Sequence, residues 1–298
     1  MTQVSNWLAF WGVVLIWSTT PLAIIYSSQE LDPLLSLSVR FALSLTVLMM
    51  WYLLTGRRLP WHTDAIRTYI AVGIIGIGLS MSCAYLSAQT LPSSWMALIF
   101  GLTPVFAGIL EGLVFRSLHL SLVHWLGMGI ALSGLGLVMF KPEQNLSDIL
   151  SFGAAMMLLA TALHALSASL VKRIKTKLTI WDTVLGGLLF ALPLTLVFWL
   201  WTGGSLPDQI NMTTVGAILY LGVIGSLAGF LLYYKTLSAF SATTSSFITL
   251  LAPPIALVWA VAINHEPMTD RLLIGTGLVL VGLWVFIRYG TTNRLKIS

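Results

Sequence analysis

The sequence predicts an all-α integral membrane protein with ten transmembrane helices, arranged as two inverted five-helix repeats around a central cavity. Composition is the first observation behind this prediction: 57% of the 298 residues are apolar, only 8% are charged, and the mean hydropathy is +0.93. Soluble domains carry about 25% charged residues. The second observation is a set of long apolar runs, which the alternating strands of a membrane β-barrel do not produce. The third is an internal repeat.

The apolar runs are each about 20 residues long, enough to cross roughly 30 Å of hydrocarbon as a helix. The links between them are too short for a soluble catalytic domain. The first run lacks the basic start and small-residue cleavage site of a signal peptide, so we expect it to stay in the mature protein. The expected spans are residues 6–26, 33–54, 66–87, 93–115, 120–140, 149–171, 180–201, 213–235, 241–263 and 270–289.

Several expected helix starts carry small oxygen-bearing side chains, which accept hydrogen bonds from the free amides of a first turn. Asp32 precedes Pro33, and Ser147 stands with Asp148. Asp182 is expected to cap the seventh helix or to pair with the basic link before it.

Basic residues fall mainly on one side of this arrangement, and acidic residues dominate the other. Because cytoplasmic loops retain Lys and Arg, both termini are expected in the cytoplasm, as an even number of spans requires. The basic side carries Arg57, Arg58, Arg67, Arg116, Lys172, Arg173, Lys175, Lys177, Lys235, Arg288, Arg294 and Lys296. The opposite side carries Lys141, Arg271, Glu30, Asp32, Glu143, Asp148, Asp208, Glu266 and Asp270.

The sequence matches itself at a shift of 149 residues. Each copy holds five spans, an odd number, so the second copy enters the membrane from the opposite face. The predicted units are residues 1–145 and 146–298. Inverted repeats are common in secondary transporters, whose site lies near the midplane between the halves. The matched pairs include Gly73 with Gly222, Gly76 with Gly225, Tyr85 with Tyr234, and Pro104 with Pro253.

The fifth and tenth helices are rich in glycine, which allows close approach of neighbouring backbones. We expect these faces to pack against other helices of the chain; the alternative is a homodimer through the same faces. The glycines are Gly127, Gly129, Gly134, Gly136, Gly275, Gly277 and Gly282.

Residues 216–285 resemble the EamA repeat of the drug/metabolite transporter superfamily. The resemblance lies in "YYKTL" at a helix end, a small-residue run into "APP", "HEP" in a loop and "GTGLVLVG" in the last helix. In the first half, "WSTTP" and "VRF" are similar to the family's first two helices. The first repeat departs from the pattern at "FRSLHL", where Ser117 stands in the place of Glu266, so any role of that acidic position belongs to Glu266.

The resemblance implies a ten-helix bundle with a central cavity in the bacterial inner membrane, which moves small organic solutes and often exports amino acids or related metabolites. No cofactor is implied. The expected partners are a small-molecule solute and membrane lipid, not nucleic acid.

Pro104 and Pro253 lie at similar depth, near the middle of their helices. A proline removes an amide donor and frees the carbonyl four residues earlier. A freed carbonyl in hydrocarbon needs protein, water or a solute, so these helix breaks are expected to line the cavity. Static kinks are the alternative.

Trp17 and His164 match each other in the repeat at a shift of 147 residues, and both are expected to face the cavity. There a ring binds cations or apolar groups, and an imidazole donates, accepts or titrates. Packing alone is the alternative for both. Arg40 is expected to clamp a carboxylate, to snorkel outward, or to pair with the link that holds Glu30 and Asp32.

Glu111 is expected to form an interfacial ion pair near Arg116; proton coupling through Glu111 or His164 is the alternative. Tyr85 and Tyr234 are interpreted as matching gates or as interfacial anchors. Trp95 and Phe247 are interpreted as lining the solute path or as facing lipid.

Some activities are not expected, because the sequence lacks the motifs that they need. No P-loop sequence occurs, so transport is expected to be secondary rather than driven by ATP. Cys83 is the single cysteine and no HExxH pair occurs, so no metal site is expected. The chain is not expected to be an enzyme; the alternatives are an intramembrane hydrolase built from Ser80 with His124 or His164, and a non-transporting membrane assembly protein.

Overall fold

The computed structural model describes residues 2–117, 120–139, 152–174, 176–207, 209–240 and 242–292. Within these residues the predicted ten-helix membrane architecture is confirmed, because ten helices are long and apolar enough to span a bilayer. The spans are Gln3–Ser27, Pro33–Leu54, Thr63–Ser87, Ser93–Val114, Leu122–Met139, Phe152–Arg173, Ile180–Trp201, Met212–Ala239, Phe247–Asn264 and Asp270–Arg288.

Seven spans are continuous α-helices and three are composed of consecutive segments. The continuous helices are α1 (Thr2–Ser27), α2 (Pro33–Leu54), α7 (Leu122–Met139), α9 (Phe152–Arg173), α10 (Ile180–Trp201), α13 (Ala242–Asn264) and α14 (Asp270–Thr292). The segmented spans are α3 (Thr63–Tyr69) with η1 (Ile70–Leu79) and α4 (Ser80–Ser87); α5 (Ser93–Gly101) with α6 (Thr103–Ile109) and η2 (Leu110–Val114); and α11 (Met212–Tyr220) with η3 (Leu221–Ala228) and α12 (Gly229–Ala239).

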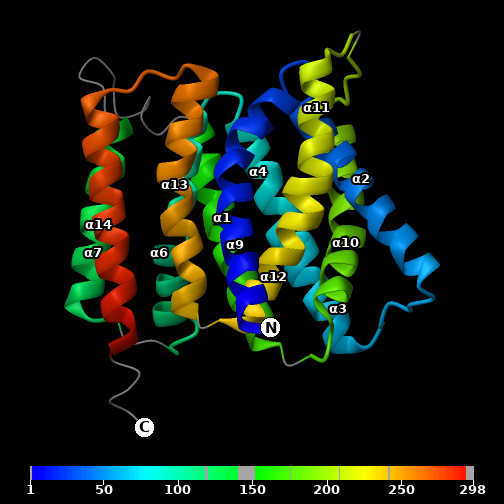
Figure 1. The fold of residues 1–298 in the computed structure, drawn as a ribbon, viewed down its shortest axis with the longest axis horizontal. Helices are drawn as coiled ribbons and strands as arrows, with labels where there is room; N and C mark the ends of the chain where they lie inside the picture. The colour runs from blue at the N-terminus through cyan, green and yellow to red at the C-terminus, as the bar shows by residue number, and fades with distance from the viewer. Residues whose placement is uncertain are drawn as a thin grey trace.

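The helices stand side by side across the bundle (Figure 1). The α7 and α14 pair forms one edge, and α1 lies in the middle, in contact with α13, α12, α11 and α5. Helix α1 begins and α14 ends on the lower side of the bundle in Figure 1, so the first helix starts and the last helix ends on the same side. Helices α2 and α9 also end on this side, which we call the basic end because Arg57 follows α2 and Arg173 is the last residue of α9.

Two predicted helix starts have the expected caps. The Asp32 carboxylate accepts from the backbone amides of Leu34 and Leu35, with Pro33 in the first turn. Asp182 forms a capping box with Thr179. Ser147 and Asp148, the predicted boundary between residues 145 and 146, and Lys141, Glu143, Lys175, Asp208, Arg294 and Lys296 lie outside the described residues.

The third and eighth spans each contain a π-helical stretch, η1 and η3, where the sequence predicts ordinary helix. These stretches include the matched glycines. A Cβ added to Gly73 would lie 2.3 Å from the Gly187 carbonyl oxygen, and one on Gly76 would lie 2.2 Å from the Ser167 hydroxyl. The π turn of η1 therefore occurs where neighbouring helices approach the backbone closely, and π-bulges are frequent at functional sites.

The two proline positions differ in the structure. The fourth span leaves the helix at Leu102, whose ψ is 0°, and Pro104 lies in the first turn of α6, where its missing donor costs little. The expected break at Pro253 is wrong, because α13 continues through Pro253 and Pro254. A proline's fixed φ is helical. The ring of Pro253 packs against Gly101, whose added Cβ would lie 3.0 Å from its Cγ.

Helices α7 and α14 pack through two reciprocal glycine contacts. A Cβ on Gly127 would lie 2.8 Å from the Gly282 carbonyl oxygen, and one on Gly134 would lie 2.6 Å from that of Gly275. Gly129 faces open space instead. These four glycines therefore pack helices of the same chain against each other, as expected.

We predict that Gly134→Ala lowers the free energy of unfolding by about 1–3 kcal/mol, because the added methyl overpacks a backbone contact. Gly129→Ala, on the open face of the same helix, should leave stability unchanged or raise it by up to about 1 kcal/mol. Thermal unfolding of both variants in detergent provides the comparison. Equal melting temperatures for the two would contradict the glycine contact.

Candidate functional site

A small cavity of about 60 Å³ lies in the centre of the bundle. It is lined by residues of α1, α2, α4, α5, α9, η3, α12 and α13, and it has room for a few water molecules. The predicted residues Trp17, Arg40, His164 and Pro253 all line it, together with Phe100. Side chains from both halves of the chain therefore meet at this cavity.

Four rings form a cluster beside the cavity. His164 lies between Trp17, Phe100 and Tyr233, with ring centroids 5.5, 5.0 and 5.5 Å away. The rings of Trp17 and Tyr233 are 4.8 Å apart. Within the described residues, the buried Nε2 of His164 has no hydrogen-bond partner. The cluster thus presents aromatic surface and one unused polar atom at mid-depth.

Arg40 is 1% exposed, although it carries a permanent charge. Its Nε donates to the Ser226 hydroxyl at 2.5 Å, and its Nη1 donates to the Tyr85 hydroxyl at 3.4 Å. The hypothesis that Arg40 snorkels outward is wrong, because the side chain is buried. The hypothesis that it pairs with the acidic link is also wrong, because Asp32 caps α2 and Glu30 accepts hydrogen bonds from Asn211. Tyr85 is therefore a buried hydrogen-bond partner of Arg40, whereas the sequence predicts a gate or an interfacial anchor.

A second, larger cavity of about 340 Å³ extends from mid-depth to the basic end. Pro104, Tyr233 and Ala107 line its inner part, and Glu111, Lys172 and Arg173 line its mouth. His164 and Thr249 line both this cavity and the central one. These two side chains separate a wide vestibule from the small chamber that contains Arg40.

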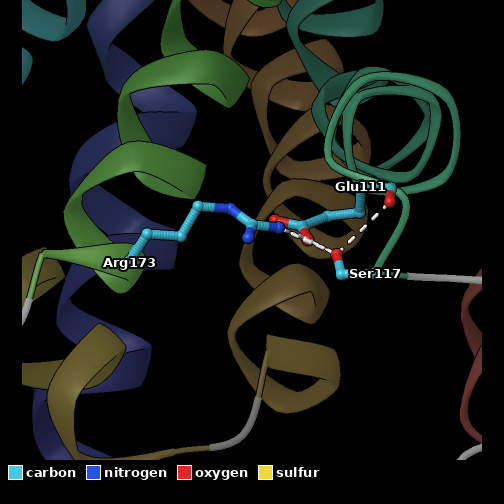
Figure 2. A network of polar contacts seen from close by, with 3 residues as sticks. All are labelled: Glu111, Ser117 and Arg173. Carbon is cyan, nitrogen blue, oxygen red and sulfur yellow. Dashed lines mark hydrogen bonds and ion pairs between the residues drawn. The ribbon is translucent and has the colours of Figure 1, made fainter.

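A polar network lies at the mouth of the vestibule (Figure 2). Figure 2 shows Arg173 reaching from α9 to the Glu111 carboxylate and to Ser117, which donates to the same carboxylate. The predicted ion pair of Glu111 is present, but its partner is Arg173 rather than Arg116. The chain turns sharply at Arg116, whose φ is 51°. The network ties the fourth span to the sixth across the vestibule.

Glu266 closes a similar connection at the other end of the bundle. Its carboxylate accepts from the backbone amides and hydroxyls of Ser93 and Ser94, and from the Asn264 amide at 3.1 Å. Burial by itself raises the pKa of Glu266, but these hydrogen bonds outweigh it and hold the pKa below its usual value. Trp95 lies beside Glu266 in a surface cleft of about 510 Å³.

The sequence profile of the EamA-like transporter family matches residues 6–140 and 151–288. The chain belongs to this family. An uncharacterized transporter of Archaeoglobus fulgidus is 26% identical over 96% of this chain and 99% of its own. Protein PecM of Dickeya dadantii is 25% identical over 94% of this chain and 92% of its own. A solved crystal structure with 15% identity aligns with a TM-score of 0.68 over 99% of both chains, which supports the fold alone.

Two further predicted residues of this EamA member lie away from the central chamber walls. Tyr234 is buried beside Tyr233, with ring centroids 5.2 Å apart. Phe247 is partly buried and packs against the apolar core. The pairing of Ser80 with His124, which the alternative hydrolase hypothesis needs, is not formed: the Ser80 hydroxyl donates to the Ala160 carbonyl at 2.8 Å, and His124 accepts from the Ser121 amide.

Sequence reasoning missed Phe100, Tyr233 and Ser226. Tyr233 directly precedes Tyr234 in "YYKTL", and the 149-residue match with Tyr85 drew attention to the second tyrosine. Successive helix positions point about 100° apart. Only the rotation of α12 decides that Tyr233 faces His164. Ser226 lies in η3, whose π turn the sequence does not predict.

We predict that Glu266→Gln lowers the free energy of unfolding by about 1–3 kcal/mol at pH 7, because the Ser93 and Ser94 donors lose a charged acceptor. A lowered native pKa stabilises the fold above the ordinary value of 4.5. The difference between wild type and variant should therefore be constant at neutral pH and should narrow as the pH falls below 4.5.

Unfolding in detergent from pH 3.5 to 8 measures this difference. Asp64→Asn is the control, because the exposed Asp64–Arg67 pair should contribute little. A wild-type stability for Glu266→Gln at pH 7 would contradict the proposed connection.

Proposed function

We propose that this protein is a secondary transporter that exports amino acids or related small metabolites by alternating access. One observation carries the proposal: the vestibule and the central chamber meet at His164 and Thr249, halfway through a bundle of membrane-spanning helices. A solute that enters from the basic end would pass the polar mouth of the vestibule and then reach the aromatic cluster before it reaches Arg40. Family membership supports transport in general.

Alternating access needs two similar states that face opposite sides, and an inverted repeat supplies them. We propose that residues 1–145 and 146–298 are such repeats. Two observations support this: η1 and η3 occupy matching positions, and the contact of Gly127 with Gly282 mirrors that of Gly134 with Gly275. We propose that the basic end faces the cytoplasm across a bacterial inner membrane, with both termini inside.

The central chamber also bears on other roles. A purely structural assembly protein has no need for a chamber that holds a buried arginine and an unpartnered imidazole, so these groups favour solute binding. If the protein forms a homodimer through its glycine-rich helices, the contact would use the open faces at Gly129, Gly136 and Gly277.

We predict that Trp17→Ala and His164→Ala each slow solute counterflow by about two- to tenfold, because an aromatic contact contributes about 0.5–1.5 kcal/mol. The measurement is counterflow in proteoliposomes with labelled amino acids, amines and nucleosides. Trp11→Ala is the matched control, since Trp11 lies on the same helix and is 50% exposed. Unchanged counterflow in both variants, at normal expression, would remove Trp17 and His164 as central contacts.

We propose that Glu111 acts through its ion pair with Arg173, which leaves His164 as the candidate for proton coupling. Glu111→Gln and Arg173→Gln should then alter the counterflow rate by similar factors, of about two- to fivefold for a partly exposed pair. The double exchange Glu111→Arg with Arg173→Glu should recover the wild-type rate. Loss of a pH-gradient response in Glu111→Gln alone would instead make Glu111 the proton carrier.

A further inference from the structure

The guanidinium of Arg40 is a buried charge, and its hydrogen-bond partners among the described residues are two hydroxyls. The rings of Phe41 and Tyr85 also lie nearby, with centroids 5.9 Å from the guanidinium carbon. The two ion pairs within the described residues are Arg67–Asp64 and Arg173–Glu111, and neither involves Arg40. Described carboxylates with other partners are Glu30, Asp32, Glu111, Asp182 and Glu266. A buried charge is costly unless an opposite charge or several hydrogen bonds compensate it. Two hydroxyls compensate it only in part.

The remaining donors of Arg40 are available to the chamber. A guanidinium has five N–H groups, and Ser226 and Tyr85 receive two of them. The Nη2 atom lies 3.6 Å from the position of a Cβ added to Gly225, and Gly225 also lines the chamber. The absence of a side chain there leaves that side of the guanidinium accessible.

We propose that Arg40 binds the anionic group of the transported solute, and that the solute is a carboxylate with a planar or apolar body. This inference rests on the proposed transport function. A planar guanidinium matches a carboxylate through two parallel hydrogen bonds. The bound carboxylate supplies the opposite charge that the described side chains around Arg40 do not.

The side chains that line the chamber also indicate the charge and shape of the rest of the solute. No Asp or Glu side chain is among its described lining residues, so a cationic solute finds no matching charge there. Trp17, Phe100 and His164 instead offer ring faces to a planar or branched apolar group. A chamber of about 60 Å³ holds a carboxylate-sized group, and the body extends past His164 toward the 340 Å³ vestibule. An amino group on the solute is therefore dispensable.

A binding role and a structural role for Arg40 predict opposite effects on stability. If Arg40 serves binding, Arg40→Met removes an incompletely compensated charge and leaves the melting temperature of the solute-free protein unchanged or higher, as at other strained functional sites. If Arg40 only joins α2 to Tyr85 and Ser226, the same substitution lowers the melting temperature.

The experiment compares solutes that share one body and differ in their charged group. Purified protein and proteoliposomes are tested with 3-phenylpropionate, L-phenylalanine, phenylalaninamide and phenethylamine, and with the corresponding indole and isobutyl compounds. Thermal stabilisation reports binding, and counterflow reports transport. Wild type should bind and move the carboxylates, with or without an amino group, and should not respond to the amides or amines.

Arg40→Met should weaken carboxylate binding by about 10- to 100-fold, which corresponds to the loss of a hydrogen bond to a charged group. Arg40→Lys keeps the charge without the planar geometry, so it should retain the preference for carboxylates at lower affinity. Arg67→Met is the control, because Arg67 is exposed at the basic end.

The outcomes separate the two proposals. Amines or amides moved in preference to carboxylates, or wild-type carboxylate binding by Arg40→Met, would overturn the role of Arg40 while transport stands. A folded wild type that moves none of these compounds but moves another solute of the amino-acid, amine and nucleoside panel would overturn the role of Arg40. A folded wild type that moves no solute of either panel would overturn the transport proposal itself. The comparison of solutes on the wild-type protein needs no variant. It therefore tests the preference for carboxylates even if Arg40→Met fails to fold.

Discussion

The hydrocarbon around the bundle supplies no hydrogen bonds, so the protein must satisfy each buried polar group from within. This constraint explains why the described spans are helical and why their hydroxyls turn back to backbone carbonyls, as Ser18 does to Leu15 and Ser38 to Leu34. It also makes every exception informative. The exceptions that bear on the central chamber are the interrupted helix at Leu102, the π turns, and the unpartnered Nε2 of His164.

Small residues occur where the helices approach most closely, and they determine the shape of the chamber. Gly101 allows the Pro253 ring and the Thr249 carbonyl to approach the fourth span. Gly76 allows the sixth span to approach η1 through Ser167. Helix packing in membranes depends on such contacts, because lipid tails are as apolar as the side chains. A larger side chain at either glycine would shift the walls that hold His164 and Arg40.

Polar connections at the two ends of the bundle differ in strength. Glu266 accepts from four groups of Ser93 and Ser94 and is almost fully buried, whereas Arg173 and Glu111 are partly exposed. Buried charge-assisted hydrogen bonds contribute more than exposed ion pairs. The end near Glu266 is therefore the firmer closure in this conformation, and the vestibule opens at the opposite, basic end.

The sequence alone determined the membrane class, the positions of the ten spans and the location of basic residues on one side, because these depend on hydrophobic length and loop charge. It also identified Trp17, Arg40 and His164 as candidates, since polar and aromatic groups at mid-depth are conspicuous in an apolar helix. Only the tertiary structure decided which partners they have. The choice of Arg173 over Arg116 for Glu111, and of Tyr233 over Tyr234 for the ring cluster, depends on helix rotation and close packing, which local sequence patterns do not specify.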